Sequence, residues 1–157
     1  MTDVAPLLRG GLERCARIVA GCEELVPFLA PVLPVQDDDL ARLPVIERIA
    51  SIALLKRYEQ LQDMIGRLFR TYLSWDGEDV RDMSRRDQAN RMERYHLIGD
   101  ADDWMDFLDL RNRLVHEYPV NEIEQVDRVN ECWAAIPRLT DIYEKLRQRL
   151  SEQGFHA

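Results

Sequence analysis

The strongest constraint on the fold is a long run, residues 44–74, that carries an apolar side chain every three or four positions without interruption. The apolar members are Ile46, Ile49, Ala50, Ala53, Leu54, Leu61, Met64, Ile65, Leu68 and Tyr72. This spacing predicts one amphipathic helix, and Pro44 suits its first turn. At 1.5 Å per residue the helix would be roughly 45 Å long. We therefore expect it to be the central scaffold or the dimer-forming helix.

Two further helices are predicted on either side of this run. Residues 5–30 carry apolar positions at helical spacing, and we expect the prolines from Pro27 onward to stop that helix. Residues 35–39 then form a linker whose aspartates are expected to cap the next helical segment. Ser84, followed three positions later by Asp87, resembles a capping box, so a helix is expected from there to Leu97. His96 at its end is assigned a structural role, because a cation complements the helix dipole.

The last part of the chain predicts a fourth and a fifth helix. Asp100 or Asp102 can cap the fourth, which is expected to end at Pro119. Asn121, with a glutamate three positions later, caps the fifth. Pro137 lies inside that fifth helix and should kink it or split it in two. With only seven glycines and no β-branched runs of strand length, the expected fold class is all-α: an up-and-down bundle of about five helices.

Composition limits the class of protein further. A length of 157 residues with 46% apolar and 32% charged residues suits one domain, residues 1–157. The net charge of -8 argues against a general nucleic-acid coat, although a small local basic site is compatible with it. The three cysteines lack metal-ligand spacing, so reduced thiols in a cytoplasmic protein are expected, with no metal and no cofactor. No stretch is long and uncharged enough to span a membrane.

One arginine stands out in residues 104–119, the part that belongs to the fourth helix. On a helical wheel the apolar face consists of Trp104, Phe107, Leu108, Leu110, Leu114, Val115 and Tyr118. Arg111 falls near the middle of that face. A guanidinium keeps its charge, so it must find a carboxylate, a set of carbonyls or a water-filled cleft. The structural interpretation is an ion pair with Glu59 or Asp63 of the second helix, and the functional one is a site.

His116 is the second residue of the candidate site. It follows Arg111 by five residues, which on an ideal helix places it roughly 140° around the axis. The two side chains therefore do not converge within one straight helix. Either the helix is distorted before Pro119, or the site is assembled from two chains. A two-fold homodimer is the more economical solution, because each copy presents the same patch to the other.

Four residues of this stretch carry a family resemblance. Arg111, Asn112, His116 and Tyr118 reproduce the form RNxxxHxY, which resembles the motif of HEPN domains, in particular the HepT-type toxins paired with minimal nucleotidyltransferase antitoxins. Support comes from the segments KRYEQLQD, ANRMERYHLIGDADDW and RNRLVHEYP. The similarity covers most of the chain and implies a HEPN-like helical homodimer in which two motifs face one cleft.

The resemblance also implies an activity. Toxins of this family cleave RNA without a metal, which would make Arg111 and His116 the catalytic residues, with Asn112 positioning them. His116 suits the acid or base role because histidine titrates near neutral pH, and Arg111 suits stabilisation of charge on the phosphate. The partner nucleotidyltransferase neutralises some toxins by attaching AMP to the tyrosine that matches Tyr118. The system would then be a type II or type VII-like toxin–antitoxin pair.

Alternatives stay open at this level. Arg85, Arg86 and Arg113 are candidates for RNA contact, but the same arginines fit a solvated face laced with ion pairs. Related proteins with a similar bundle are non-catalytic companion subunits of a nucleotidyltransferase. A purely structural helical dimer is the third interpretation.

Overall fold

The computed structural model describes residues 3–156, and these form five α-helices, one short 3-10 helix and no strand. The elements are α1 (Ala5–Leu29), η1 (Leu40–Arg42), α2 (Val45–Trp75), α3 (Arg85–Arg94), α4 (Ala101–His116) and α5 (Glu122–Glu152). The all-α bundle expected from the sequence is therefore confirmed. So is the long second helix, which begins directly after Pro44.

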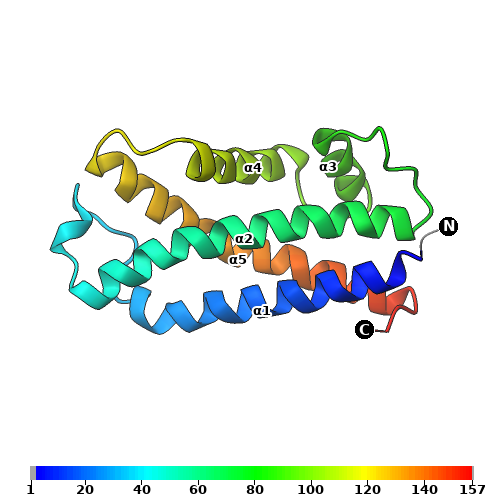
Figure 1. Ribbon diagram of the computed structural model, residues 1–157, viewed down its shortest axis with the longest axis horizontal. Helices are drawn as coiled ribbons and strands as arrows, with labels where there is room; N and C mark the ends of the chain where they lie inside the picture. The colour runs from blue at the N-terminus through cyan, green and yellow to red at the C-terminus, as the bar shows by residue number, and fades with distance from the viewer. Residues whose placement is uncertain (1–2, 157) are drawn as a thin grey trace.

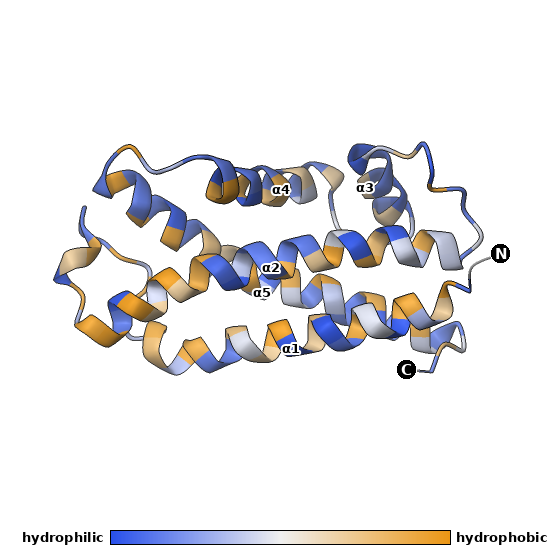
Figure 2. Ribbon diagram, in the orientation of Figure 1, coloured by the Kyte–Doolittle hydropathy of each residue, from blue (hydrophilic) through white to orange (hydrophobic). Residues whose placement is uncertain are grey.

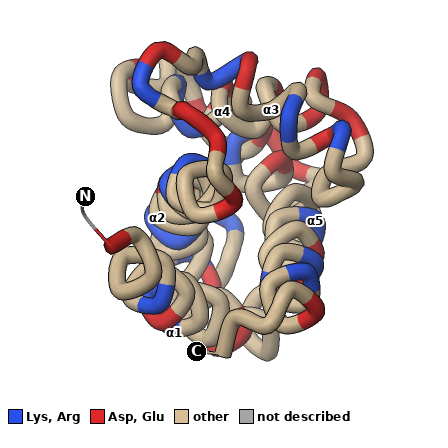
Figure 3. The backbone as a smooth tube through the Cα atoms, turned by 90° about the vertical axis from the view of Figure 1, so that its right-hand side faces the viewer, with Lys and Arg blue, Asp and Glu red and all other residues tan. Residues whose placement is uncertain are grey.

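The three long helices α1, α2 and α5 lie side by side, and α3 and α4 follow one another along one side of them (Figure 1). Seen along the bundle in Figure 3, α3 and α4 form a layer above α2 and α5. Helix α2 packs against each of the other four α-helices, which confirms its place as the central scaffold. Tyr58, at the middle of α2, is fully buried and donates a 2.6 Å hydrogen bond to the backbone carbonyl of Phe107 in α4.

The contact between α1 and α2 depends on a small residue. A Cβ atom at Gly11 would lie 2.7 Å from Cδ2 of Leu68, which is itself buried, so the helices approach at van der Waals distance here. Helix α1 passes through Pro27 and ends at Leu29. Pro27, which was expected to stop the helix, therefore does not stop it, since a proline in the last turn costs at most one backbone hydrogen bond.

Helix α3 begins as predicted and ends three residues early. Ser84 and Asp87 form the reciprocal capping box. The helix stops at Arg94 because His96 takes a left-handed backbone conformation, with φ 60°. The amide of Leu97 then donates to the carbonyl of Met92 and that of His96 to Glu93, which is a Schellman ending. His96 therefore has a structural role, but through its backbone conformation and not through the dipole interaction expected of it.

The fourth and fifth helices differ from expectation at their proline residues. Helix α4 is capped by Asp100 and ends at His116, three residues before Pro119, because its C-cap residue Glu117 is already in extended geometry. Tyr118 is therefore outside the helix, and its place on the helical wheel was wrong. Helix α5, capped by Asn121, is continuous through Pro137 and is not split. All three cysteines are buried and free.

Candidate functional site

Arg111 belongs to α4 and reaches toward α2. Its Nη2 is 3.6 Å from Oδ1 of Asp63, and its Nη1 donates to Oδ1 of Asn112 at 3.1 Å. The side chain is 22% exposed, and its Nε is buried without a partner within the described chain. The carboxylate predicted from the wheel is thus present and is Asp63. Glu59, the other candidate, pairs with Lys56.

Asp63 is shared between two arginines. Its Oδ2 lies 3.0 Å from Nε of Arg67, one turn further along α2, while its other oxygen faces Arg111. One negative charge divided over two guanidinium groups leaves the cluster with a net positive charge. Arg111 is therefore held in place without being neutralised, which is the condition for an arginine that stabilises a phosphate.

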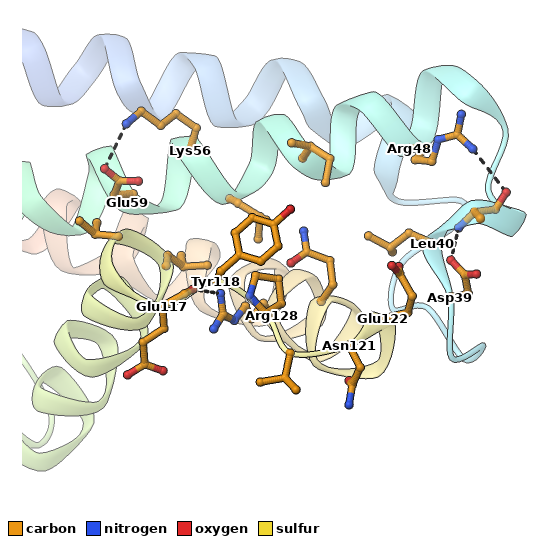
Figure 4. Close-up of a pocket in the computed structure, with 18 of the residues that line it drawn as sticks. Asp39, Leu40, Arg48, Lys56, Glu59, Glu117, Tyr118, Asn121, Glu122 and Arg128 are labelled. Carbon is orange, nitrogen blue, oxygen red and sulfur yellow. Dashed lines mark hydrogen bonds and ion pairs between the residues drawn. The ribbon is translucent and has the colours of Figure 1, made fainter.

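His116 lies on a different feature of the surface. It is exposed at the end of α4 and lines an open groove of about 1130 Å³ between the first half of α2, the α4–α5 loop and the start of α5. Figure 4 shows this groove. Arg111 does not line it. Within one chain, His116 and Arg111 thus do not line a common cavity, as the wheel predicts.

Tyr118 is the most exposed large apolar or aromatic side chain of the described residues, at 92%. It sits in the loop between α4 and α5, and Figure 4 shows its ring standing between that loop and α2. Its hydroxyl makes no hydrogen bond within residues 3–156. Tyr118, the expected acceptor of AMP, is consequently placed where an enzyme could reach it, two residues from His116.

The loop that carries Tyr118 is fixed by an arginine that the sequence interpretation missed. Arg128 of α5 is buried; it donates to the backbone carbonyl of Glu117 at 2.6 Å and to Oε1 of Glu124 at 2.9 Å. Glu124 in turn accepts the amide of Val120, which lowers the pKa of its carboxyl, with Arg128 contributing. A wheel of α5 would have found Arg128, because it lies on the buried face with Cys132, Ala135 and Leu139.

The three arginines proposed as RNA contacts have different surroundings. Arg113 pairs with Glu131 at 3.1 Å and with Asp109 at 3.3 Å, so it joins α4 to α5. Arg86 is paired with Asp102. Arg85 lines a second cleft of about 420 Å³ between α2, α3 and α4, which also contains Asp63. Of the three, only Arg85 faces a cavity beside Arg111 and has no ion-pair partner within the described residues.

An apolar surface surrounds the groove. Figure 2 shows hydrophobic residues along the first turns of α2. The exposed apolar residues that line the groove are Ile49, Ile52, Val115, Tyr118 and Val120, and Val45, Ile46 and Ile123 are exposed close to lining residues in the sequence; each is at least 41% exposed. Exposed apolar side chains gathered in one place mark an interaction surface.

The described residues contain no group of three or more acidic, histidine or cysteine side chains arranged to hold a metal ion. None of their helices is long and apolar enough to cross a membrane.

Comparison with known proteins identifies the relationship of the chain. Residues 41–150 match a family model described as nucleotidyltransferase substrate binding protein like. The match covers more than two thirds of the chain, and it includes α2 to α4 and nearly all of α5. It therefore spans Arg111, Asn112, His116 and Tyr118 and leaves out α1. A search of curated proteins finds no match.

Proposed function

The chain belongs to the family of nucleotidyltransferase substrate binding protein-like proteins, and from that membership we propose that it is the RNA-cleaving partner of a nucleotidyltransferase. The observation that carries the proposal is the separation of the two polar residues. His116 lines the groove, whereas Arg111 does not line it and lies beside Asp63 of α2. A second copy supplies the missing half of each site.

The apolar surface around the groove supports this dimer. Val45, Ile46 and Ile49 on α2 are each about 60% exposed, which costs free energy in water and is relieved when a second copy covers them. Because Val115 and Val120 flank His116 and Tyr118 in sequence and share this surface, covering it would bring the two copies of the motif together. The expected assembly is a two-fold homodimer with a self-complementary interface.

The chemistry that fits these residues is RNA cleavage by transesterification, in which the ribose 2′-hydroxyl attacks the adjacent phosphodiester. His116 removes the proton of a 2′-hydroxyl, the 2′-oxygen bonds to phosphorus, and the bond to the 5′-oxygen breaks. The departing 5′-oxygen takes a proton from the second imidazole of the dimer. Arg111 carries the positive charge that stabilises the pentacoordinate phosphorus. The products are a 2′,3′-cyclic phosphate and a 5′-hydroxyl.

Tyr118 fits the role of regulatory acceptor in the same proposal. The nucleotidyltransferase partner would join the phenol oxygen to the α-phosphate of ATP, with loss of pyrophosphate and of the phenol proton. An AMP group there adds a negative charge and a bulky nucleoside two residues from His116. It would obstruct both the groove and the approach of RNA.

A second candidate function is a non-catalytic companion of the nucleotidyltransferase. The specific observation in its favour is that Arg111 already has Asp63 and Asn112 as partners. On this alternative the role of Arg111 is structural: its contact with Asp63 joins α4 to α2. In that case the exposed loop around Tyr118 would be a docking surface for the transferase.

The experiment that separates the two candidates is expression of the wild type, His116→Ala and Arg111→Met, followed by RNA cleavage with the purified proteins in excess EDTA. The proposal expects growth arrest and 2′,3′-cyclic ends from the wild type alone. His116 is exposed, so its replacement leaves the fold intact, and circular dichroism provides that control. Harmlessness of all three proteins, with no cleavage, would overturn the proposal and favour the companion function. For the dimer, sedimentation should give twice the 18.4 kDa chain mass.

A further inference from the structure

The cleft between α2, α3 and α4 is a cluster of positive charge in an acidic protein. We name it the arginine cleft and define it by Gln62, Asp63, Arg67, Arg70 and Arg85, which line it. Three guanidinium groups face one carboxylate there, although the whole chain has a net charge of -8. Within residues 3–156, Arg70 and Arg85 form no ion pair. An anion is the complementary occupant of such a cleft.

The wall of the arginine cleft also holds an unsatisfied polar group. Gln62 is 1% exposed, and its Oε1 is buried without a hydrogen-bond partner in the described chain. Leaving a buried amide oxygen unpaired costs about 1–3 kcal/mol. An amide oxygen accepts hydrogen bonds and cannot pair with a phosphate oxygen, so the case for an anion in the cleft rests on the arginines.

The arginine cleft adjoins the proposed catalytic arginine. Asp63 lines the cleft and pairs with Arg111. Glu59, one turn earlier on α2, lines the groove that contains His116. Four residues of helix correspond to roughly 6 Å, so Arg111 stands on the ridge that separates the two cavities. A polymer that passes from the groove over this ridge would enter the arginine cleft.

We propose that the arginine cleft binds the phosphodiester backbone of the RNA strand that flanks the cleavage site. This inference rests on the proposed function and adds where the substrate lies. The aromatic and aliphatic floor, Trp104 and Leu108, is buried and offers no free ring face on which a base could stack. The contacts therefore come from guanidinium groups to phosphates, and binding depends little on base sequence.

The test measures binding apart from cleavage. The full chain carrying His116→Ala is titrated into a fluorescein-labelled single-stranded RNA of twelve nucleotides, and anisotropy is followed over a range of salt concentrations. The cleft variant adds Arg70→Ala and Arg85→Ala. The matched control adds Arg17→Ala and Arg94→Ala, which remove the same charge at exposed positions outside the cleft. All four side chains are exposed, so the fold is retained.

The expected result is selective loss in the cleft variant. Each lost phosphate contact lowers the magnitude of the slope of log K against log salt by about 0.7, so this slope should be about 1.4 smaller in the double variant. The double variant should also bind RNA on the order of tenfold more weakly at 0.1 M salt. The control should stay within twofold of its parent, and oligo(U) and oligo(A) should bind alike. Equal weakening of both variants, or no weakening of the cleft variant, would overturn the inference.

Two further outcomes separate this inference from its alternatives. If AMP at millimolar concentration displaces the RNA and the cleft variant no longer binds AMP, the cleft is a mononucleotide site and the inference is wrong. If the chain with His116 intact cleaves no RNA while the cleft variant still shows selective loss, the proposed function fails and the binding site stands. If instead the chain cleaves RNA and Arg70→Ala with Arg85→Ala leaves the cleavage rate unchanged at low RNA concentration, the proposed function stands and the inference about the arginine cleft is wrong.

Discussion

The guanidinium of Arg128 donates to the backbone carbonyl of Glu117 at 2.6 Å and so fixes the loop between α4 and α5 to the buried face of α5. The same guanidinium holds Glu124, whose carboxylate caps the amide of Val120 on the other side of Tyr118. The loop is therefore attached at both ends, although Tyr118 itself is almost fully exposed. The position of the tyrosine depends on a residue ten positions further along the chain.

The first prediction concerns Arg128 itself. Arg128→Ala removes a charged hydrogen bond to Glu117 and another to Glu124, and should lower the free energy of unfolding by about 2 kcal/mol. Arg128→Lys retains the charge but has a single donor nitrogen in place of the two that bind Glu117 and Glu124, and should lose about half as much. Urea denaturation measures both, and amide hydrogen exchange at Val120 should accelerate in parallel. A variant with wild-type stability and unchanged exchange would show that the loop needs no such attachment.

The second prediction concerns the pH dependence that Glu124 contributes. The backbone amide of Val120, followed by Arg128, lowers the pKa of this carboxyl from its ordinary value of 4.5. A carboxyl whose pKa is lower in the folded state stabilises the fold at any pH above its unfolded-state pKa. This stabilisation is lost as the pH falls through its folded-state pKa. The difference in urea midpoint between wild type and Glu124→Gln should therefore be constant at neutral pH and shrink below about 4.5. A difference that grows on acidification would contradict the assigned contacts.

The third prediction concerns the ion pair between Asp63 and Arg111. Both side chains are partly exposed and their closest atoms are 3.6 Å apart, so a double-mutant cycle with Asp63→Asn and Arg111→Met should give a coupling energy of about 0.5 kcal/mol. Asp63→Asn also removes the only acidic side chain lining the arginine cleft. It should tighten RNA binding in the anisotropy assay, whereas weaker binding would mean that Asp63 orients Arg111 for the ligand.

The fourth prediction concerns the end of α3. His96 adopts a left-handed conformation, which costs a residue with a Cβ roughly 1–2 kcal/mol relative to glycine. His96→Gly should therefore stabilise the fold by about 1 kcal/mol. Gly77 has φ 94° and serves as the matched control, since Gly77→Ala places a Cβ in the left-handed region and should destabilise the fold. Thermal unfolding of both variants checks the pair, and a destabilised His96→Gly would reveal contacts of the imidazole that outweigh the backbone strain.

The fifth prediction concerns the thiols. Burial raises the pKa of Cys15 to about 12, with Cys22 and Glu144 adding to it, and burial raises that of Cys22 to about 11. Protonated, inaccessible thiols react slowly. Cys132 is buried as well, so Ellman's reagent at pH 8 should modify none of the three cysteines in the folded protein and all three after addition of guanidinium chloride. Rapid reaction of the native protein would place a thiol at the surface.

The sequence predicted the helix starts well because capping is local chemistry. Ser84 with Asp87 and Asn121 with Glu124 act within one turn, and both caps are present. Helix interiors and ends were predicted less well. Pro137 was expected to kink or split α5, and the helix is not split, because packing of a long buried face outweighs one missing hydrogen bond. His96 ends α3 through a left-handed conformation that periodicity does not encode.

The candidate site was partly visible in the sequence for a similar reason. The wheel located the carboxylate for Arg111, because α4 and α2 pack with their apolar faces together. It misplaced Tyr118, since a wheel assumes that the helix continues. The arginine cleft was beyond reach, because Arg70 and Arg85 come from different helices and meet only through the packing of α3 on α2.

The attachment of the loop to α5 affects how natural variants of this chain should be interpreted. Substitutions at positions 124 and 128 can shift Tyr118 and the groove while all four residues of the RNxxxHxY motif are retained. Two homologues with identical motifs could thus differ in activity or in their susceptibility to modification, and the cause would lie in the fifth helix. A motif search alone would score them as equivalent, whereas a comparison that includes Glu124 and Arg128 would separate them.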